Sequence, residues 1–220
     1  MIIAVDGPSA SGKGTLARRL AQHYGLRHLD TGALYRMVGL AVLLSGGDPA
    51  DEKAALTAAK TIDLTLLEHP ELRSEATGGA ASKVAAQPAV REALLQFQRD
   101  FATDNGGAVL DGRDIGTVVC PEADAKLFVV ARADVRAKRR HAELASYGIA
   151  PPYEAVLADI EARDARDMNR AVAPLRPAPD ALLLDTSDLD IDAAVQQALI
   201  LVDKCLAERK LGSPAVRNRS

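Results

Sequence analysis

A run of nine residues near the N-terminus has the residue types and spacing needed to hold phosphate. It spans residues 7–15 and follows a short apolar run at residues 2–5, which predicts a strand. Glycines allow a backbone to curl so that successive N–H groups point at one anion. A helix that begins near Lys13 directs the positive end of its dipole to the same place, and the Lys13 ammonium adds a full charge. The predicted phosphate-binding loop (P-loop) consists of Gly7, Pro8, Ser9, Ala10, Ser11, Gly12, Lys13, Gly14 and Thr15.

The loop departs from the general P-loop pattern at one position. That pattern places Ser or Thr directly after the lysine, where the hydroxyl binds Mg²⁺. This chain has Gly14 there, and the hydroxyl comes one residue later, at Thr15. The alternative to a P-loop is a Gly/Ser-rich turn that binds nothing, which leaves the lysine and the flanking strand and helix unexplained.

Two further groups of charged residues follow predicted strands. Arg36 comes about a turn and a half into a helix that starts near Thr31, where its guanidinium would be able to fork onto a phosphate. Alternatively, Asp30 or Thr31 only caps that helix and Arg36 is solvated. Arg113 and Asp114 follow the apolar run at residues 108–110, and ligands of α/β sheets bind at the carboxyl edge of the strands. A turn with a local salt bridge is the alternative for this pair.

Polar residues at helical spacing form the remaining candidates. Arg163, Asp167 and Arg170 are four and three residues apart, so they are predicted to share one face of a helix. That face suits a phosphate and a sugar hydroxyl, but it equally suits a weak surface salt-bridge ladder. Ser82 and Arg91 lie around a predicted helix that starts at residue 88 and has an apolar face formed by Val90, Leu94, Leu95 and Phe97. Arg91 has the alternative of an ordinary exposed arginine. A basic helix is either a solvated face or a lid over a nucleotide; its cations are Arg132, Arg136, Lys138, Arg139 and Arg140.

Short apolar runs alternate with amphipathic stretches along the chain. Strands are predicted at residues 2–5, 26–30, 108–110, 126–131 and 181–184, and helices include residues 33–44 and 191–210. Continuous apolar strands separated by helices are typical of a parallel sheet with both faces covered. The sequence therefore predicts an α/β fold, a parallel sheet covered by helices on both faces, in one domain over residues 1–220.

Two segments do not follow this alternation. Residues 61–87 and 147–152 are interpreted as parts of mobile insertions, with ordinary connections as the alternative. We expect a monophosphate-binding arm within residues 31–100 and a lid at residues 138–165. Residues 211–220 are predicted to be a polar, frayed tail.

Composition limits the possible partners. The net charge of −3 and the 3% of aromatic residues argue against nucleic acid, because the chain has no basic field and few rings for stacking. No apolar stretch is long enough for a membrane span, and the first residues are predicted to form a strand rather than a signal peptide. The two cysteines and four histidines match no metal spacing, so no residues are assigned to bind a metal. We expect a cytoplasmic monomer without membrane or nucleic-acid partners.

Five blocks of sequence, in this order, resemble the bacterial cytidylate kinases, a group of P-loop kinases that act on nucleoside monophosphates. The blocks are residues 7–15, LDTGALYR (29–36), SKVAAQPAVREAL (82–94), DGRDIGTVV (111–119) and RDARDMNRAVAPL (163–175). The order Gly-Lys-Gly-Thr is also the form seen in kinases of the adenylate kinase type. The resemblance implies a P-loop kinase core with an acceptor-binding insertion and a lid. It also implies transfer of the γ-phosphoryl group of ATP to CMP or dCMP, with Mg²⁺ held mainly by phosphates and water.

The resemblance also implies roles for individual residues. The cytosine would be contacted by Ser82, Arg91 and Asp114, with the Asp114 carboxylate accepting from the exocyclic amine. The sugar would be held by Arg163 and Asp167. The phosphates would be clamped by Arg36, Arg113 and Arg170, and Thr31 would keep a hydroxyl where the family often has Ser. The catalytic residues would be Lys13, Arg113 and Arg170. Residues 63–82 look shortened against a longer, strand-rich insertion in the family.

Three other functions compete with this interpretation. A kinase for UMP or AMP is the nearest, and only Ser82, Arg91 and Asp114 argue against it. A small-molecule kinase of the shikimate type leaves the blocks at residues 111–119 and 163–175 unexplained. A GTPase-like switch requires an Asn-Lys-x-Asp motif, which the sequence lacks.

Overall fold

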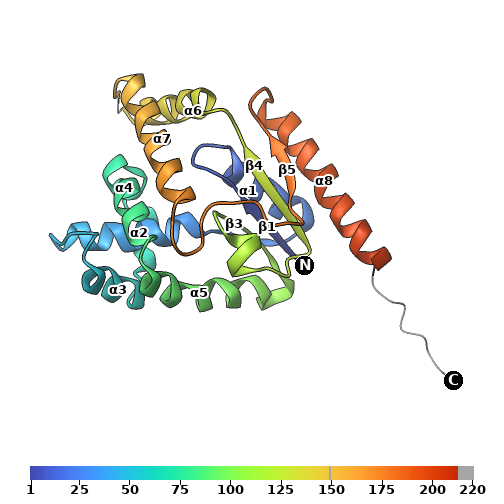
Figure 1. The fold of residues 1–220 in the computed structure, drawn as a ribbon, viewed down its shortest axis with the longest axis horizontal. Helices are drawn as coiled ribbons and strands as arrows, with labels where there is room; N and C mark the ends of the chain where they lie inside the picture. The colour runs from blue at the N-terminus through green and yellow to red at the C-terminus, as the bar shows by residue number, and fades with distance from the viewer. Residues whose placement is uncertain (149, 213–220) are drawn as a thin grey trace.

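A five-stranded sheet forms the centre of the molecule. The computed structural model describes residues 1–148 and 150–212. The strands are β1 (Ile2–Asp6), β2 (Arg27–Asp30), β3 (Ala108–Gly112), β4 (Ala125–Val130) and β5 (Leu182–Asp185). They lie in the order β2-β3-β1-β4-β5, and all four pairings are parallel (Figure 1). The carboxyl ends of all five strands therefore meet at one edge of the sheet.

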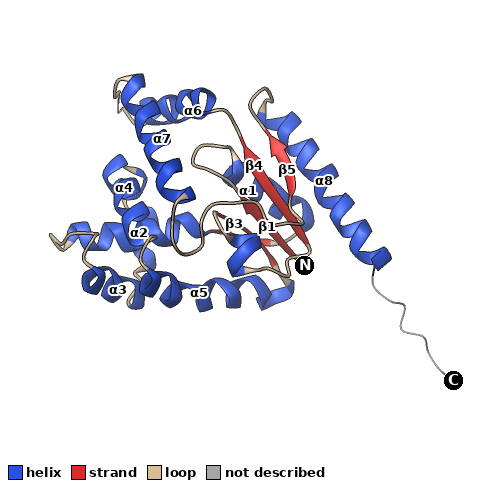
Figure 2. Cartoon of the chain, viewed as in Figure 1, coloured by secondary structure: helices blue, strands red, loops and turns tan. Residues whose placement is uncertain are grey.

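Helices cover both faces of this sheet (Figure 2). Side chains alternate along a strand, so Ile3 and Val5 of β1 face one side while Ala4 faces the other. Ile3 and Val5 belong to a core with α1 (Lys13–Tyr24) and α8 (Ile191–Gly212). Ala4 belongs to a second core with α5 (Pro88–Thr103) and the short helix η4 (Ile115–Val119). The predicted α/β fold with a covered parallel sheet is confirmed.

An all-helical arm extends from the β2 side of the sheet. Besides α5 it contains α2 (Thr31–Leu44), α3 (Glu52–Lys60), η1 (Leu64–Glu68), η2 (Pro70–Arg73) and α4 (Glu75–Val84). A core of its own, which includes the fully buried Met37, Leu40 and Leu94, holds these helices together. The short helix η3 (Asp104–Gly106) then leads from α5 into β3.

A helix pair lies beyond the carboxyl end of β4. It consists of α6 (Ala133–Ser146) and α7 (Tyr153–Met168), which pack on each other through Ala137, Leu144, Val156 and Ile160. The pair faces α4 of the arm across the carboxyl edge of the sheet (Figure 1). The predicted lid region, residues 138–165, falls within this pair. None of the helices in the described part of the chain has the length and apolar character needed to cross a membrane.

Three local expectations are corrected by the structure. Residues 61–87 follow the helical pattern after all, because their prolines and glycines do not interrupt it: Pro70 starts η2 and Gly78 lies inside α4. A proline at the first helical position costs little, since the N–H that it lacks has no partner in the helix there. Phe97, expected in the apolar face of α5, is 40% exposed. Arg170 lies beyond the end of α7 rather than on its face.

The C-terminal helix is longer than expected. It was predicted to end at residue 210, but α8 continues to Gly212, which takes two residues from the predicted polar tail. The rest of that tail, residues 213–220, lies outside the described residues, as does residue 149 in the predicted loop at 147–152.

Close packing of α2 against α4 depends on Gly39. A Cβ at Gly39 would lie 2.9 Å from the Ala81 nitrogen and 3.0 Å from the Ala80 Cβ. We expect Gly39→Ala to lower the free energy of unfolding by about 1–3 kcal/mol, because the two helices must separate. Urea denaturation measures this change. Gly79→Ala is the matched control: a Cβ there meets nothing within 4 Å, so it stabilises by up to about 1 kcal/mol. Equal effects of the two substitutions would contradict the packing argument.

Candidate functional site: two adjoining pockets at the carboxyl edge

The predicted P-loop connects the end of β1 to the start of α1. Gly12 adopts a left-handed backbone (φ 89°) directly before the first residue of α1, a conformation that glycine tolerates without strain. Gly7 packs so closely on β4 that a Cβ would lie 2.1 Å from the Val129 carbonyl oxygen. The loop therefore depends on glycine at both positions, and the N-terminus of α1 opens into the space that it encloses.

Lys13 points from this loop into a buried space that it shares with Arg113, Asp111 and Asp30. Its Nζ donates to the Pro8 carbonyl oxygen at 3.4 Å. Burial, together with the nearby Arg113 guanidinium, lowers the pKa of Lys13 from 10.5 to about 8, and the Asp111 and Asp30 carboxylates oppose that change. A phosphate in the cavity would reverse the effect, because an anion favours the ammonium form.

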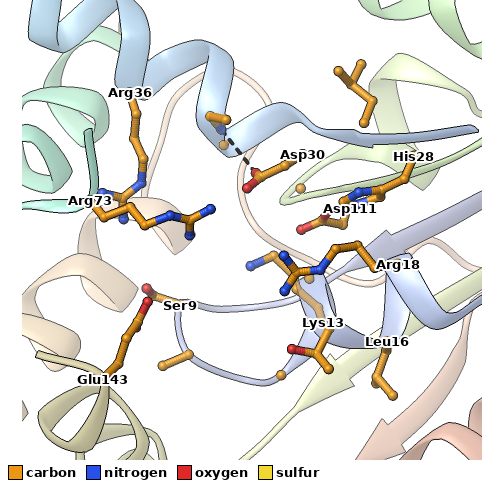
Figure 3. Close-up of a pocket in the computed structure, with 18 of the residues that line it drawn as sticks. Ser9, Lys13, Leu16, Arg18, His28, Asp30, Arg36, Arg73, Asp111 and Glu143 are labelled. Carbon is orange, nitrogen blue, oxygen red and sulfur yellow. Dashed lines mark hydrogen bonds and ion pairs between the residues drawn. The ribbon is translucent and has the colours of Figure 1, made fainter. Parts of the chain in front are cut away.

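A cavity of about 1260 Å³ opens above the loop. Its walls come from the P-loop, the ends of β2 and β3, the arm and α6 (Figure 3). The figure shows Lys13 and Arg18 on one side of this space and Arg36 and Arg73 on the other. On volume alone, the cavity is large enough for a nucleotide, since ligand pockets usually measure about 300–1,000 Å³.

A second, smaller pocket of about 80 Å³ adjoins it. All eight residues that were predicted to bind the acceptor line this pocket, although they come from five separate parts of the chain. They are Thr31, Arg36, Ser82, Arg91, Asp114, Arg163, Asp167 and Arg170. The fold thus brings the whole predicted set together.

Buried ion pairs organise the charges of this second pocket. Asp167 accepts from Arg113 Nε at 2.8 Å and also from Arg170 Nη2. Burial alone would raise the pKa of Asp167, but the two guanidiniums lower it below its ordinary value. Arg91 donates to Asp114, whose pKa is raised because burial outweighs the attraction of Arg91. Asp167 therefore lies between two arginines that would otherwise repel each other, and Asp114 offsets the charge of Arg91.

Two arginines at the pocket donate to backbone carbonyls, and Arg163 is in addition paired with the Asp159 carboxylate at 3.5 Å. Arg36 Nη1 donates to the Leu72 oxygen at 3.2 Å, and Arg163 Nη2 donates to the Gly78 oxygen at 3.0 Å. Burial and the neighbouring guanidiniums, Arg163 first, lower the pKa of Arg36 to about 10. Both arginines therefore have donor capacity suited to an anion.

Some buried polar atoms of the pocket are left unsatisfied. Ser82 Oγ and Arg170 Nε are both buried and have no hydrogen-bond partner among the described residues. Buried polar groups are normally paired, so each such atom calls for an explanation. A polar ligand in this pocket would supply both partners.

Thr31 is held below the pocket by the end of β3. Its hydroxyl donates to the Asp111 carbonyl oxygen at 2.7 Å, while Asp30 caps α2 by accepting from the Ala33 N–H at 3.0 Å. Asp30, rather than Thr31, is therefore the residue whose side chain caps α2.

Asp6, at the end of β1, is an important residue that the sequence analysis did not single out. Its two carboxylate oxygens accept from the backbone N–H groups of Ile115 and Gly116, each at 2.8 Å, and so fix the turn that carries Arg113 and Asp114. Burial raises the pKa of Asp6 to about 7, although these hydrogen bonds oppose it. The partners are 109 and 110 residues away, so no local pattern signalled the contact.

Arg136 of the basic helix is likewise structural in its contacts. It is 4% exposed, forms two hydrogen bonds to Asp164 of α7, and donates to the Ser9 carbonyl oxygen at 3.2 Å. Arg139 donates to Thr186 Oγ1 at 3.0 Å and lines the large cavity. The helix pair α6–α7 is thereby tied to the P-loop.

Fold and site together define a P-loop α/β protein with two adjoining pockets that are both lined by arginines. A solved structure of an uncharacterised protein from Eubacterium ventriosum has the same fold, with a TM-score of 0.54 and 15% identity over 92% of this chain and 98% of that one. The model of the cytidylate kinase family matches residues 3–204. The chain belongs to the cytidylate kinase family.

Curated relatives agree over nearly the whole length. The cytidylate kinase of Bradyrhizobium diazoefficiens is 56% identical over 96% of this chain and 100% of its own length. The cytidylate kinase of Bradyrhizobium sp. is 57% identical over 96% of this chain and 99% of its own length. The cytidylate kinase of Xanthobacter autotrophicus is 59% identical over 95% of this chain and 100% of its own.

The lowered pKa of Lys13 is open to direct measurement. We expect the Lys13 side chain to titrate near pH 8, because burial and Arg113 disfavour its ammonium form. NMR of ¹³C-labelled lysine measures the midpoint, and loss of the signal in Lys13→Ala assigns it. Added tripolyphosphate should move the midpoint upward. A Lys13 midpoint at the value of exposed lysines, about 10.4, would contradict the described environment.

Proposed function

We propose that this protein transfers the γ-phosphoryl group of ATP to CMP or dCMP, which gives ADP and CDP or dCDP. The observation that carries the proposal is the junction of the two pockets. Arg36 and Arg113 line both of them, as do Gly32 and Gly112. A donor phosphate above the P-loop and an acceptor phosphate in the small pocket would therefore meet beside two guanidiniums.

The small pocket suits a cytosine nucleotide. The Asp114 carboxylate is an acceptor for the exocyclic amine, and Ser82 and Arg91 present donors to the acceptor edge of the base. The unsatisfied Ser82 Oγ supports this role. Arg163 and Asp167 would hold the sugar, and Arg170 would complete a clamp on the phosphates with Arg36 and Arg113. Thr31, which also lines the pocket, would orient the acceptor.

ATP is proposed to lie in the large cavity with its phosphates in the loop of residues 7–15. Mg²⁺ fits the oxygen donors there: the Thr15 hydroxyl and the Asp30 and Asp111 carboxylates line the cavity. No group of three or more His, Cys, Asp or Glu residues in the described chain would hold a metal alone, so the ion would be shared with the nucleotide phosphates. Bound there, Mg²⁺ would neutralise phosphate charge.

The residues present meet the demands of phosphoryl transfer. The acceptor is already a phosphate oxyanion, so no general base is needed, and the protein must mainly align two anions that repel each other. Lys13, Arg113 and Arg170 would stabilise the charge on the moving group. The small pocket, at about 80 Å³, is below the usual size of a ligand site, so the arm or the lid must open to admit the acceptor.

The protein is proposed to act as a monomer in the cytoplasm. In support of the monomer, one chain supplies every residue of both proposed pockets. In support of the location, the net charge is −3 and no membrane anchor is needed for water-soluble nucleotide substrates.

The first test is ADP release by purified protein with ATP and Mg²⁺. We expect release that depends on CMP or dCMP and is much slower with UMP, AMP, GMP or shikimate. Lys13→Ala, checked for folding by circular dichroism, should abolish turnover because the loop loses its only lysine. Release with a different monophosphate would retain the kinase and remove the cytosine roles of Ser82, Arg91 and Asp114. Normal turnover by folded Lys13→Ala would refute the assignment.

A second test concerns choice of base. Asn at position 114 keeps one acceptor oxygen but adds an amide donor, which suits the carbonyl of uracil. We expect Asp114→Asn to lower kcat/KM for CMP roughly 10- to 100-fold and to raise the UMP/CMP ratio. Steady-state kinetics with both acceptors measures the ratio. Asp48→Asn, at an exposed aspartate outside the pocket, is the matched control. An unchanged ratio in folded Asp114→Asn would remove Asp114 from base recognition.

A further inference from the structure

The short helix η2 lies where the arm meets the helix pair α6–α7. Two arginines from different elements hold its last two residues: Arg36 of α2 donates to the Leu72 oxygen at 3.2 Å, and Arg140 of α6 donates to the Arg73 oxygen at 3.0 Å. Leu72 is 4% exposed and belongs to the core of the arm. The backbone at Arg73 is therefore anchored on three sides.

The side chain of Arg73 extends from this anchored point into the large cavity. Figure 3 shows its guanidinium beside Arg36 and directed toward the centre of the space, across from Lys13. It forms no hydrogen bond or ion pair with any residue in the described ranges 1–148 and 150–212. Its donors are thus available in the cavity.

Arg73 therefore lies close to another cation, Arg36, and across the cavity from Lys13. Arg36 already has its pKa lowered by burial and by Arg163, Arg140 and Arg113. Unlike Arg113 and Arg170, Arg73 has no carboxylate partner to offset the repulsion. The exposed Arg73 guanidinium, beside Arg36 and without a carboxylate partner, is placed to meet an anion that enters the cavity.

We propose that Arg73 is a catalytic residue that contacts the phosphoryl group during transfer. This inference rests on the proposed function. In the reaction the acceptor phosphate oxygen forms a bond to the γ-phosphorus, and the bond from that phosphorus to the β,γ-bridging oxygen breaks. ADP leaves with the electron pair. Arg73 adds positive charge from the arm, opposite the charge that Lys13 adds from the loop.

The hydrogen bond from Arg140 to the Arg73 carbonyl oxygen makes the position of Arg73 depend on closure of the arm against α6. The donor guanidinium belongs to α6 and the acceptor carbonyl to the arm, so the bond forms only when these two parts approach each other. Arg73 is then held in the cavity at the stage when water must be excluded.

Substitutions test the role. We expect Arg73→Ala to lower kcat at least tenfold, with a smaller change in KM for ATP and CMP, because related arginines are worth roughly 10³–10⁵ in rate. Arg73→Lys should restore part of the loss. Arg166→Ala, at an exposed arginine on α7, is the matched control and should leave kcat unchanged.

Thermal denaturation separates catalysis from structural support. Without ligand, Arg73→Ala should melt at the wild-type temperature or slightly above it, since a repulsion is removed. Its gain in Tm on addition of tripolyphosphate should be smaller than that of the wild type. A normal kcat, or a lost kcat with a lowered Tm in the absence of ligand, would overturn the proposal.

The same measurements distinguish this inference from the proposed function. Wild-type protein without CMP-dependent ADP release would refute the proposed function and, with it, the catalytic role of Arg73. Wild-type protein that is active, together with an equally active Arg73→Ala, would refute only the role of Arg73.

Discussion

Repulsion between arginines is the constraint that shapes the centre of this molecule. A site for two phosphate-bearing substrates needs several cations within one small volume, and those cations oppose one another until the substrates bind. Buried carboxylates relieve part of that repulsion: Asp167 lies between Arg113 and Arg170, and Asp114 pairs with Arg91. A chain with a net charge of −3 can in this way present a strongly positive pocket. The positive charge is local, which suits selective binding of small anions better than attraction of polyanions.

The sheet transmits this arrangement to the loops. β1 lies between β3 and β4, so the P-loop that follows β1 and the turn that follows β3 emerge side by side. Asp6 connects them, because it ends β1 and accepts two N–H groups of the turn after β3. A buried carboxylate with a raised pKa is costly to place there. In return, Asp6 fixes the position of the phosphate loop relative to the turn that carries Arg113 and Asp114.

The sequence predicts those elements that depend on neighbouring residues. It does not predict those that depend on contacts between distant residues. The P-loop combines a strand, a glycine-rich turn and a helix within a few residues, so its composition was sufficient. The segment at residues 61–87 was misjudged because proline and glycine have two uses: Pro70 starts a helix, and Gly78 makes room for Arg163. Phe97 is exposed where it lines the large cavity, and that cavity is formed by elements far apart in the sequence. The contacts of Asp6 span more than a hundred residues and leave no local signal.

The hydrogen bonds of the acceptor-pocket arginines suggest how binding and closure are coupled under the proposed function. Arg36 and Arg163 donate to the carbonyl oxygens of Leu72 and Gly78, both of which belong to the arm. A phosphate anion accepts stronger hydrogen bonds from a guanidinium than a neutral carbonyl does. An arriving monophosphate therefore competes for the same guanidiniums that hold η2 and α4. Because each arginine has five N–H donors, it can keep the arm bonded while it takes the anion. The bond of Arg36 lies within the arm, whereas the bond of Arg163 joins the arm to α7. An acceptor bound at Arg163 would therefore lie at the contact between the arm and the helix pair, and this supports closure as a direct consequence of acceptor binding.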